Sequence, residues 1–199
     1  MTFEARLSVV IPTVGRSTVG EAVASVKSQL RPGVDEIVLV ADTAAAVWDE
    51  GLTPGVWPAA WIAGPHGDWG AAARNVGMAL ARGTHLCFLD DDDRWLPGAG
   101  EAIRAAVGEW PYIFHIFRMR QPGGRVLWER EVLEKGNVGT PMLVHPKLRV
   151  PVAWDAKYDH DFRYAESVSR WCAGWSKSVM WNPAVICEVG HVPPPGEKR

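Results

Sequence analysis

The chain has 199 residues, of which 47% are hydrophobic and 22% are charged, and its formal net charge is −2. This length suits one domain with a substantial core. The small net charge excludes a global field that recruits nucleic acid or an anionic membrane. The three widely spaced cysteines fit neither a zinc site nor a disulfide scaffold, so we expect a reducing compartment. No apolar stretch approaches the ~20 residues of a membrane helix, and no signal peptide is recognisable. We therefore expect a soluble, cytoplasmic protein.

The first half of the chain alternates between short apolar runs and helical patterns. The β-branched run at 7–11, ended by Pro12, predicts a buried first strand. Apolar residues then recur at helical spacing from position 19 to position 26. The same reasoning predicts strands at 36–40, around 60–62 and at 86–89, and helices near 47–48, at 71–81 and at 98–107. This succession predicts an α/β fold with a mainly parallel central sheet and helices on both faces.

The later residues have a different pattern. Residues 112–119 and 125–128 predict the two strands of an antiparallel hairpin, joined by a Gly-rich turn. A short strand at 142–144 and a helix at 162–170 are expected after it. The proline-rich residues 193–199 predict a flexible tail. No internal repeat or linker divides the chain, so we expect a single domain over residues 1–199.

Four consecutive aspartates, Asp90 to Asp93, follow the apolar strand at 86–89. Four like charges in a partly desolvated site repel one another unless a cation lies among them. A hard divalent cation such as Mg²⁺ or Mn²⁺, which also holds substrate phosphates, suits these oxygen ligands. The alternative is a solvated acidic turn. The strand favours the metal site, because ligands of open α/β sheets bind at the carboxyl ends of the strands.

Four motifs in order along the chain resemble the inverting, family 2-type glycosyltransferases with the GT-A fold. They are Leu-Ser-Val-Val-Ile-Pro-Thr at 7–13, Glu-Ile-Val-Leu-Val-Ala-Asp at 36–42, Ala-Arg-Asn-Val-Gly at 73–77, and Phe-Leu-Asp-Asp-Asp-Asp-Arg-Trp-Leu-Pro at 88–97. The resemblance implies a GT-A domain, Rossmann-like in architecture, that transfers a sugar from a nucleotide-diphosphate sugar to an acceptor hydroxyl. Residues 1–97 would bind the nucleotide sugar, and residues 98–192 would bind the acceptor.

The resemblance also implies roles for the donor-binding residues. Pro12 and Thr13 would end the first strand beneath the nucleotide base. Asp42 would hydrogen-bond the base, which is commonly uracil, so a UDP-sugar is favoured, and a carboxylate acceptor suits a ring N–H. Arg74 would approach the base or the phosphates.

Within the aspartates, the family pattern assigns Asp90 to the ribose and Asp92 to a Mn²⁺ or Mg²⁺ ion that bridges the diphosphate. Asp91 and Asp93 would support them, and the register is open by one residue. Some relatives add a late histidine as a metal ligand, and His191 is the residue that matches.

An inverting transfer needs a general base for the acceptor hydroxyl. In the family this base is often the aspartate of a Glu-Asp motif, and the segment at 158–162 is the nearest match. Tyr158 replaces the usual glutamate, Asp159 occupies the base position, and Asp161 is the competing candidate. Trp69 and Trp95 are candidates for lining the sugar pocket, with core packing favoured for Trp95.

Three alternatives remain open from the sequence. The first is nucleotidyl transfer on a similar fold, and the second is a non-catalytic module that binds nucleotide or glycan. The third is a glycosyltransferase whose acceptor is a modified nucleic-acid base, contacted by the arginines of the predicted hairpin, Arg118, Arg120, Arg125 and Arg130. A solvated basic hairpin is favoured over that reading, so the expected acceptor is a glycan, a small molecule or a peripheral acceptor. The sequence leaves the oligomeric state open.

Overall fold

The computed structural model describes residues 3–44, 58–149, 152–172 and 178–190. The expected helix near 47–48, the expected tail at 193–199 and His191 lie outside these residues. The strands are β1 (Leu7–Thr13), β2 (Glu36–Ala41), β3 (Ala60–Trp61), β4 (His85–Phe88), β5 (Arg94–Trp95), β6 (Phe114–Arg120), β7 (Val126–Leu127), β8 (Leu143–Pro146) and β9 (Val179–Glu188). The helices are α1 (Val19–Lys27), α2 (Ala71–Leu80), α3 (Ala99–Glu109) and α4 (His160–Cys172), with a 3₁₀ turn at Thr140–Met142.

One sheet runs through both halves of the described chain, in the order β3-β2-β1-β4-β8-β6-β9-β5, with β7 paired to β6. Strands β1 to β4 are parallel to one another where they pair. Beyond β4 the sheet is mixed, because β8 is antiparallel to both β4 and β6, whereas β9 is parallel to β6. The α/β fold and the β6–β7 hairpin are therefore confirmed, with antiparallel strands concentrated in the second half.

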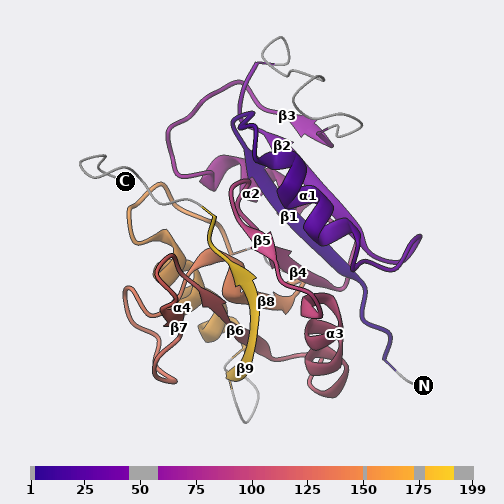
Figure 1. The fold of residues 1–199 in the computed structure, drawn as a ribbon, viewed down its shortest axis with the longest axis vertical. Helices are drawn as coiled ribbons and strands as arrows, with labels where there is room; N and C mark the ends of the chain where they lie inside the picture. The colour runs from indigo at the N-terminus through magenta and orange to yellow at the C-terminus, as the bar shows by residue number, and fades with distance from the viewer. Residues whose placement is uncertain (1–2, 45–57, 150–151, 173–177, 191–199) are drawn as a thin grey trace.

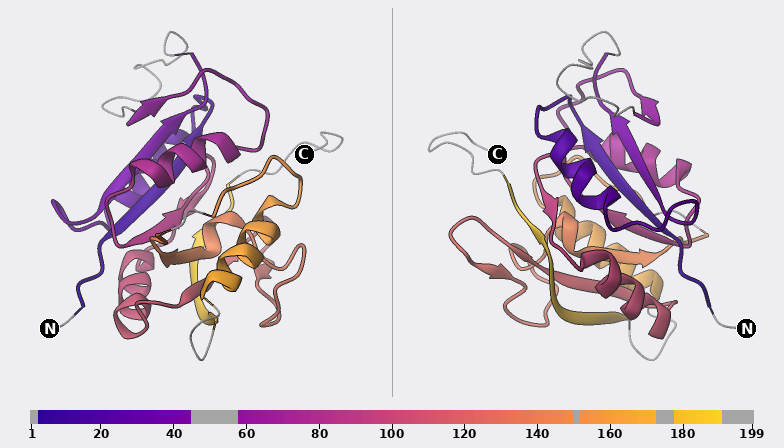
Figure 2. Two further views of the ribbon diagram at one scale, coloured as in Figure 1. Left: turned by 180° about the vertical axis from the view of Figure 1, so that it is seen from behind. Right: turned by 45° about the vertical axis from the view of Figure 1, so that its right-hand side comes forward.

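The helices cover both faces of the sheet. Helices α1 and α3 lie on the side that faces the viewer in Figure 1, and α2 and α4 come forward when the molecule is seen from behind in Figure 2. Helix α2 approaches β1 closely, because a Cβ at Gly77 would lie only 2.4 Å from Cγ1 of Val10. Gly77 thus fixes the distance between this helix and the strand beneath it. None of the helices in the described residues is long and apolar enough to cross a membrane.

Strand β9 is not predicted by the sequence pattern. It contains Pro183, and a proline inside a strand normally argues against the assignment because it donates no ladder hydrogen bond. The structure accommodates it at an irregularity, where the pairing shifts from Ile116 with Trp181 to Arg118 with Val185. Strand β9 has extra residues at this shift, and Pro183 is one of them. The proline therefore lies where the regular ladder of hydrogen bonds is interrupted, and no ladder bond is lost.

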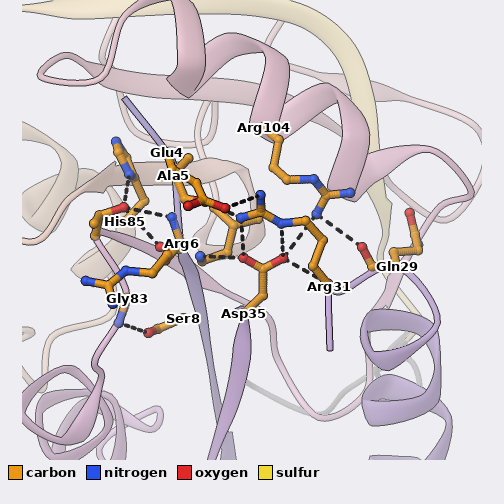
Figure 3. Close-up of polar contacts among 12 residues, drawn as sticks. Glu4, Ala5, Arg6, Ser8, Gln29, Arg31, Asp35, Gly83, His85 and Arg104 are labelled. Carbon is orange, nitrogen blue, oxygen red and sulfur yellow. Dashed lines mark hydrogen bonds and ion pairs between the residues drawn. The ribbon is translucent and has the colours of Figure 1, made fainter. Parts of the chain in front are cut away.

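Asp35 forms a closed ion network at the amino ends of β1 and β2 (Figure 3). Its side chain is fully buried and accepts hydrogen bonds from the backbone N–H groups of Leu7 (3.0 Å) and Arg31 (2.9 Å). The guanidinium groups of Arg31 and Arg104 lie 3.1 and 3.4 Å from its two oxygens. Burial raises the pKa of Asp35, but the bonds from Arg31 and the backbone outweigh this effect and lower it.

Three histidines are buried in the neighbouring strands β4, β6 and β8. Burial lowers the pKa of His85 to about 4 and that of His145 to about 4, and it also lowers the pKa of His115. His145 Nε2 lies 2.8 Å from the hydroxyl of Tyr164, and His85 Nε2 lies 2.9 Å from the carbonyl oxygen of Pro111. These side chains are therefore neutral packing elements of the core at pH 7.

Candidate donor and acceptor site

The carboxyl ends of β1, β2 and β4 border a cavity of about 840 Å³. This volume suits a small-molecule or cofactor site. The predicted residues that line it are Pro12, Thr13, Asp42, Trp69, Arg74, Asp90, Asp91, Asp92, Asp93, Tyr158, Asp159 and Asp161. The structure therefore brings together residues from all four motifs and the segment at 158–162. Trp95 is 3% exposed and belongs to the core, so it packs as favoured from the sequence.

The Ala-Arg-Asn motif lies on the first turns of α2 and connects two parts of the cavity wall. Arg74 is 2% exposed, and its Nη1 donates to the carbonyl oxygen of Trp69 at 2.6 Å. Its Nη2 donates to Asp90, and its guanidinium lies 4.8 Å from the ring centre of Trp154. Asn75 exchanges two hydrogen bonds with the backbone of Trp154, at 2.8 and 3.0 Å. The motif thus orients Asp90 and fixes the segment around Trp154.

The four aspartates divide into two inward and two outward side chains. Asp91 and Asp93 are 2% and 4% exposed. The hydroxyl of Thr13 donates to Oδ2 of Asp91 at 2.6 Å, and Arg16 Nη1 donates to Oδ1 at 2.7 Å, so both oxygens have protein donors. Burial raises the pKa of Asp91, although Thr13 and Arg16 oppose this effect. The side chains of Asp90 and Asp92 are 33% and 16% exposed and are the more accessible pair.

Asp42 directly follows β2, is 3% exposed and contacts the loop at 64–66. Its Oδ2 accepts the backbone N–H of His66 at 3.1 Å, and its Oδ1 lies 2.6 Å from His66 Nδ1. A Cβ at Gly64 would lie 1.8 Å from Oδ1, so only glycine fits there. The hydrogen bond to Asp42 and the charge of Asp42 raise the pKa of His66. Each carboxylate oxygen retains a lone pair for another donor, as recognition of a ring N–H requires.

Asp159 also lines the cavity and directly precedes α4. Its Oδ2 forms an ion pair with Lys135 at 2.7 Å. The hydrogen bond from Lys135 lowers the pKa of Asp159 and outweighs the opposing effect of burial. Lys135 is held by a compact loop, in which the buried Asn137 bonds the backbone of Glu129 and Arg130 at 2.8 and 2.7 Å.

Asp161 has a different environment from Asp159. Its Oδ1 accepts the hydroxyl of Thr140 and lies 2.9 Å from His160 Nε2. The other ring nitrogen of His160 lies 3.1 Å from the carbonyl oxygen of Lys157. Both ring nitrogens face oxygen atoms, an arrangement that favours the protonated form of the ring. Burial lowers the pKa of His160, but its bond to Asp161 and the charge of Asp161 outweigh this effect and raise it.

Two exposed aromatic side chains border the cavity. Trp69 is 42% exposed and Tyr158 is 75% exposed, and their rings meet edge to face at 6.2 Å. Trp69 has a φ of 60°, a strained value for a large residue. Asp68 accepts the N–H groups of Gly70 (3.1 Å) and Ala72 (2.7 Å) and so holds the loop in this conformation. Such strain is characteristic of functional sites.

The arginines of the β6–β7 hairpin region have partners within the protein. Arg118 lies 5.1 Å from the ring centre of Trp128. The other three pair with glutamates, Arg120 with Glu188 at 3.7 Å, Arg125 with Glu129 at 2.7 Å, and Arg130 with Glu134. Acidic partners neutralise much of the positive charge of this region, as expected for a solvated basic hairpin.

The residues that hold these carboxylates were missed by reasoning from sequence. Arg16, His66, Lys135 and His160 each contact a predicted site residue, as the distances above show. Only the position of Arg16 could have been recognised in the sequence. It follows Thr13 by three residues and therefore lies near the end of the first strand, which pairs with the strand before the aspartates. Lys135 lies in a charged stretch that gives no indication of its partner.

The carboxylates suit a hard divalent cation only in its open mode of binding. Among the described residues, no group of three or more His, Cys, Asp or Glu side chains is arranged to enclose a metal. Mg²⁺ and similar ions are commonly bound by one or two carboxylates together with substrate phosphates and water. The accessible pair Asp90 and Asp92 fits that mode. Gly190 lies against this turn, because its N–H donates to Asp93 Oδ1 at 3.2 Å.

Known proteins give a consistent picture of the fold. The crystal structure of S. aureus TarS superposes with a TM-score of 0.68 at 15% identity, over 94% of this chain and 37% of that one. S. aureus TarS 1-349 in complex with UDP gives 0.67 at 16% identity, over 92% of this chain and 60% of that one. The mannosyltransferase PcManGT from Pyrobaculum calidifontis, in complex with GDP-Man and Mn²⁺, gives 0.68 at 16% identity, over 98% and 59%. The chain thus spans between 37% and 60% of the length of these structures.

Sequence comparison identifies the family directly. No curated protein matches the chain. The family described as Glycosyl transferase family 2 matches residues 8–150, which is more than half of the chain. The architecture is therefore the GT-A fold, and the chain belongs to glycosyl transferase family 2.

Proposed function

We propose that the chain transfers a sugar from a nucleoside-diphosphate sugar to an acceptor hydroxyl, with inversion at the anomeric carbon. One observation carries the proposal: a single cavity gathers Asp42, Arg74, Asp90, Asp92 and Asp159. This arrangement supplies contacts for a base, a diphosphate and an acceptor hydroxyl in one space of suitable size.

The donor-binding wall is assigned to the ends of β1, β2 and β4. Pro12 and Thr13 lie beneath the nucleotide base, and Asp42 accepts a hydrogen bond from a ring N–H of that base. Arg74 gives a hydrogen bond to the nucleotide sugar while it also holds Asp90. TarS has been crystallised with UDP and with UDP-GlcNAc, and PcManGT with GDP-Man and Mn²⁺. These complexes support a nucleotide-sugar donor. We favour a UDP-sugar because the carboxylate of Asp42 suits the imide N–H of uracil.

A divalent cation, Mn²⁺ or Mg²⁺, is assigned to Asp92 with help from Asp90. When bound, it stabilises negative charge on the departing diphosphate. Asp91 supports the site from within, because both of its oxygens are held by Thr13 and Arg16. The assignment of His191 as a further ligand rests on the family resemblance alone.

The acceptor-side chemistry is assigned to Asp159. The acceptor oxygen forms a bond to C1 of the sugar while Asp159 takes the hydroxyl proton, and the bond from C1 to the phosphate oxygen breaks. The nucleoside diphosphate leaves with the bonding electron pair. We favour Asp159 over Asp161, because Asp159 occupies the base position of the family motif and has one partner, Lys135, whereas Asp161 Oδ1 has two, Thr140 and His160. Asp161 is then a positioning residue for the start of α4.

The acceptor is assigned to the side of the cavity bordered by Trp69 and Tyr158. Aromatic rings offer apolar faces for a sugar, while Lys135 and Asp159 supply polar contacts for its hydroxyl groups. A glycan or a hydroxylated small molecule fits these groups better than a nucleic-acid base, because the hairpin arginines are already paired.

The proposal is tested by donor binding with and without Mn²⁺. A thermal-shift series with UDP-, GDP- and dTDP-sugars should reveal one class that stabilises the protein only when Mn²⁺ is present, by RT ln(1 + [L]/Kd). Asp92→Asn should abolish that metal dependence. Unchanged metal-dependent binding in Asp92→Asn would sink the metal assignment. Release of pyrophosphate from nucleoside triphosphates would instead favour nucleotidyl transfer.

A further inference from the structure

Arg16 lies between two of the four aspartates. Its Nη1 is 2.7 Å from Oδ1 of Asp91 and 3.2 Å from Oδ2 of Asp92. The side chain of Asp91 is 3% exposed, and a buried carboxylate requires a nearby positive charge or several donors. Arg16 supplies that charge, so the contact with Asp91 is part of the folded structure.

The two contacts of Arg16 differ in strength. The contact with Asp91 is shorter and buried, whereas Asp92 is 16% exposed and its contact is longer. Half of the Arg16 side chain, 51%, is exposed, and the residue lines the cavity. Gly15 precedes it with a φ of 87° and open space where a Cβ would lie, and its N–H donates to the Thr13 hydroxyl at 2.9 Å. The bond to Asp92 is therefore the one that is easier to break.

We propose that Arg16 exchanges partners when the donor binds. Its guanidinium keeps Asp91, releases Asp92 and donates to the diphosphate of the nucleotide sugar, and Asp92 becomes available to the divalent cation. The inference rests on the proposed function of this cavity. It is chemically consistent, because a guanidinium has five donors in a planar fork and can hold a carboxylate with one edge and a phosphate with another.

The exchange couples the two ligands of the site. A divalent cation that arrives alone competes with Arg16 for Asp92, whereas a bound diphosphate removes this competition. The nucleotide should therefore strengthen binding of the cation, and by linkage the cation should strengthen binding of the nucleotide by the same factor. Part of this coupling should depend on Arg16.

The test measures binding by isothermal titration calorimetry, with no turnover. The ligands are Mn²⁺ alone, UDP or GDP alone, the corresponding monophosphate alone, and Mn²⁺ with the diphosphate. The variants are Arg16→Gln and Arg16→Lys. Arg94→Gln is the matched control, because Arg94 is 52% exposed and pairs with Glu188 at 3.3 Å. Arg94 adjoins the aspartates in sequence but does not line the cavity.

We expect Arg16→Gln to weaken binding of the diphosphate about ten- to a hundredfold. The monophosphate should lose less than about threefold, since it lacks the second phosphate. Mn²⁺ alone should bind about two- to fivefold more tightly, because Asp92 no longer has a competing partner. The diphosphate affinity of Arg16→Lys should lie between those of Arg16→Gln and the unaltered chain. Lysine keeps the positive charge but lacks the planar set of donors of the guanidinium group. Arg94→Gln should match the unaltered chain.

Two results would overturn the exchange. One is an unchanged ratio of diphosphate to monophosphate affinity in Arg16→Gln, and the other is unchanged or weaker binding of Mn²⁺ alone. If the unaltered chain binds neither UDP nor GDP, the proposed function itself fails, and the Mn²⁺ titration then decides the role of Arg16 separately. Arg16→Lys keeps the test valid if Arg16→Gln is unstable, because it retains a cation beside Asp91.

Discussion

A single buried carboxylate, Asp35, and an accessible group that includes Asp90 and Asp92 lie at opposite ends of the parallel strands β1, β2 and β4, and they differ in how many of their oxygen lone pairs have partners. At the amino ends, Asp35 is fully enclosed, with two arginines and two backbone N–H groups around it. At the carboxyl ends, Asp90 and Asp92 remain accessible, and each has one arginine partner. The closed group leaves no capacity for a ligand, whereas the open group does. The number of unfilled acceptor positions, more than the number of charges, therefore distinguishes a structural cluster from a binding site.

The largest expected effect concerns the cavity at the carboxyl ends of the strands, which Asp159 also lines. Asp159→Asn should lower kcat by about 10²- to 10⁴-fold, because a general base contributes about that much. Binding of the nucleotide sugar should persist, since Asp159 contacts the acceptor. Stopped-flow or discontinuous product assays measure the rate, and Glu166→Gln, on α4, is the control. Full activity in Asp159→Asn would transfer the role to Asp161.

The second effect concerns the buried carboxylate of Asp35 at the amino ends of the strands. Asp35→Asn should lower the free energy of unfolding by about 3–5 kcal/mol, because Arg31 and Arg104 would lose a buried partner. Urea denaturation measures this change. Glu4→Gln removes an exposed partner of Arg31, at 3.4 Å, and should cost less than about 1 kcal/mol. A change in nucleotide affinity in folded Asp35→Asn would contradict the separation between the two ends.

A third effect should appear on mild acidification and arises from the buried histidines. The folded pKa of His85 and of His145 is about 4, well below the ~6.5 of an unfolded histidine. The unfolded chain therefore binds more protons between these values, and stability is complete above pH 6.5 and is lost as the pH falls towards 4. Each histidine should contribute up to about 3 kcal/mol to this loss.

Urea midpoints at pH 7, 6 and 5 measure the acid effect. His145→Gln should flatten the dependence, because one titrating group is removed, although its stability at pH 7 should also fall. A dependence that is unchanged in His145→Gln would assign the acid sensitivity to other groups.

The smallest expected effect tests the aromatic border of the open end. Tyr158→Ala should raise the acceptor KM about three- to tenfold, from loss of about 1 kcal/mol of ring contact, and leave donor binding unchanged. Tyr158→Phe should behave like the unaltered chain if the ring face matters. A loss in Tyr158→Phe equal to that in Tyr158→Ala would assign the effect to the hydroxyl group.

Much of the fold was predictable, because buried parallel strands carry continuous apolar runs. The strands at 7–11, 36–40 and 86–89 and the helices at 71–81 and 98–107 all appear within a few residues of their expected positions. Strand β9 was missed because Pro183 and several polar residues mask its pattern. Its proline is tolerated only because of a pairing irregularity with β6, which local sequence does not encode.

The site was predictable in its carboxylates and unpredictable in their partners. Asp90 and Asp92 follow a strand and therefore had to lie at the edge of the sheet. The environment of Asp91 between them depends on residues about 75 positions away, Arg16 and Thr13, which meet it only after the strands pair. No local rule predicts that Asp91 turns inward while its neighbours stay accessible.

The end of β9 has a consequence for how the molecule acquires its site. A Cβ at Gly190 would lie 1.9 Å from the carbonyl oxygen of Asp92, so the chain closes directly onto the aspartate turn. This contact joins positions almost a hundred residues apart, and contacts of such long range form late in folding because their loop-closure cost is high. The turn should therefore reach its final shape only when the last strand docks. A chain whose last strand has not docked should therefore lack a correctly shaped aspartate turn.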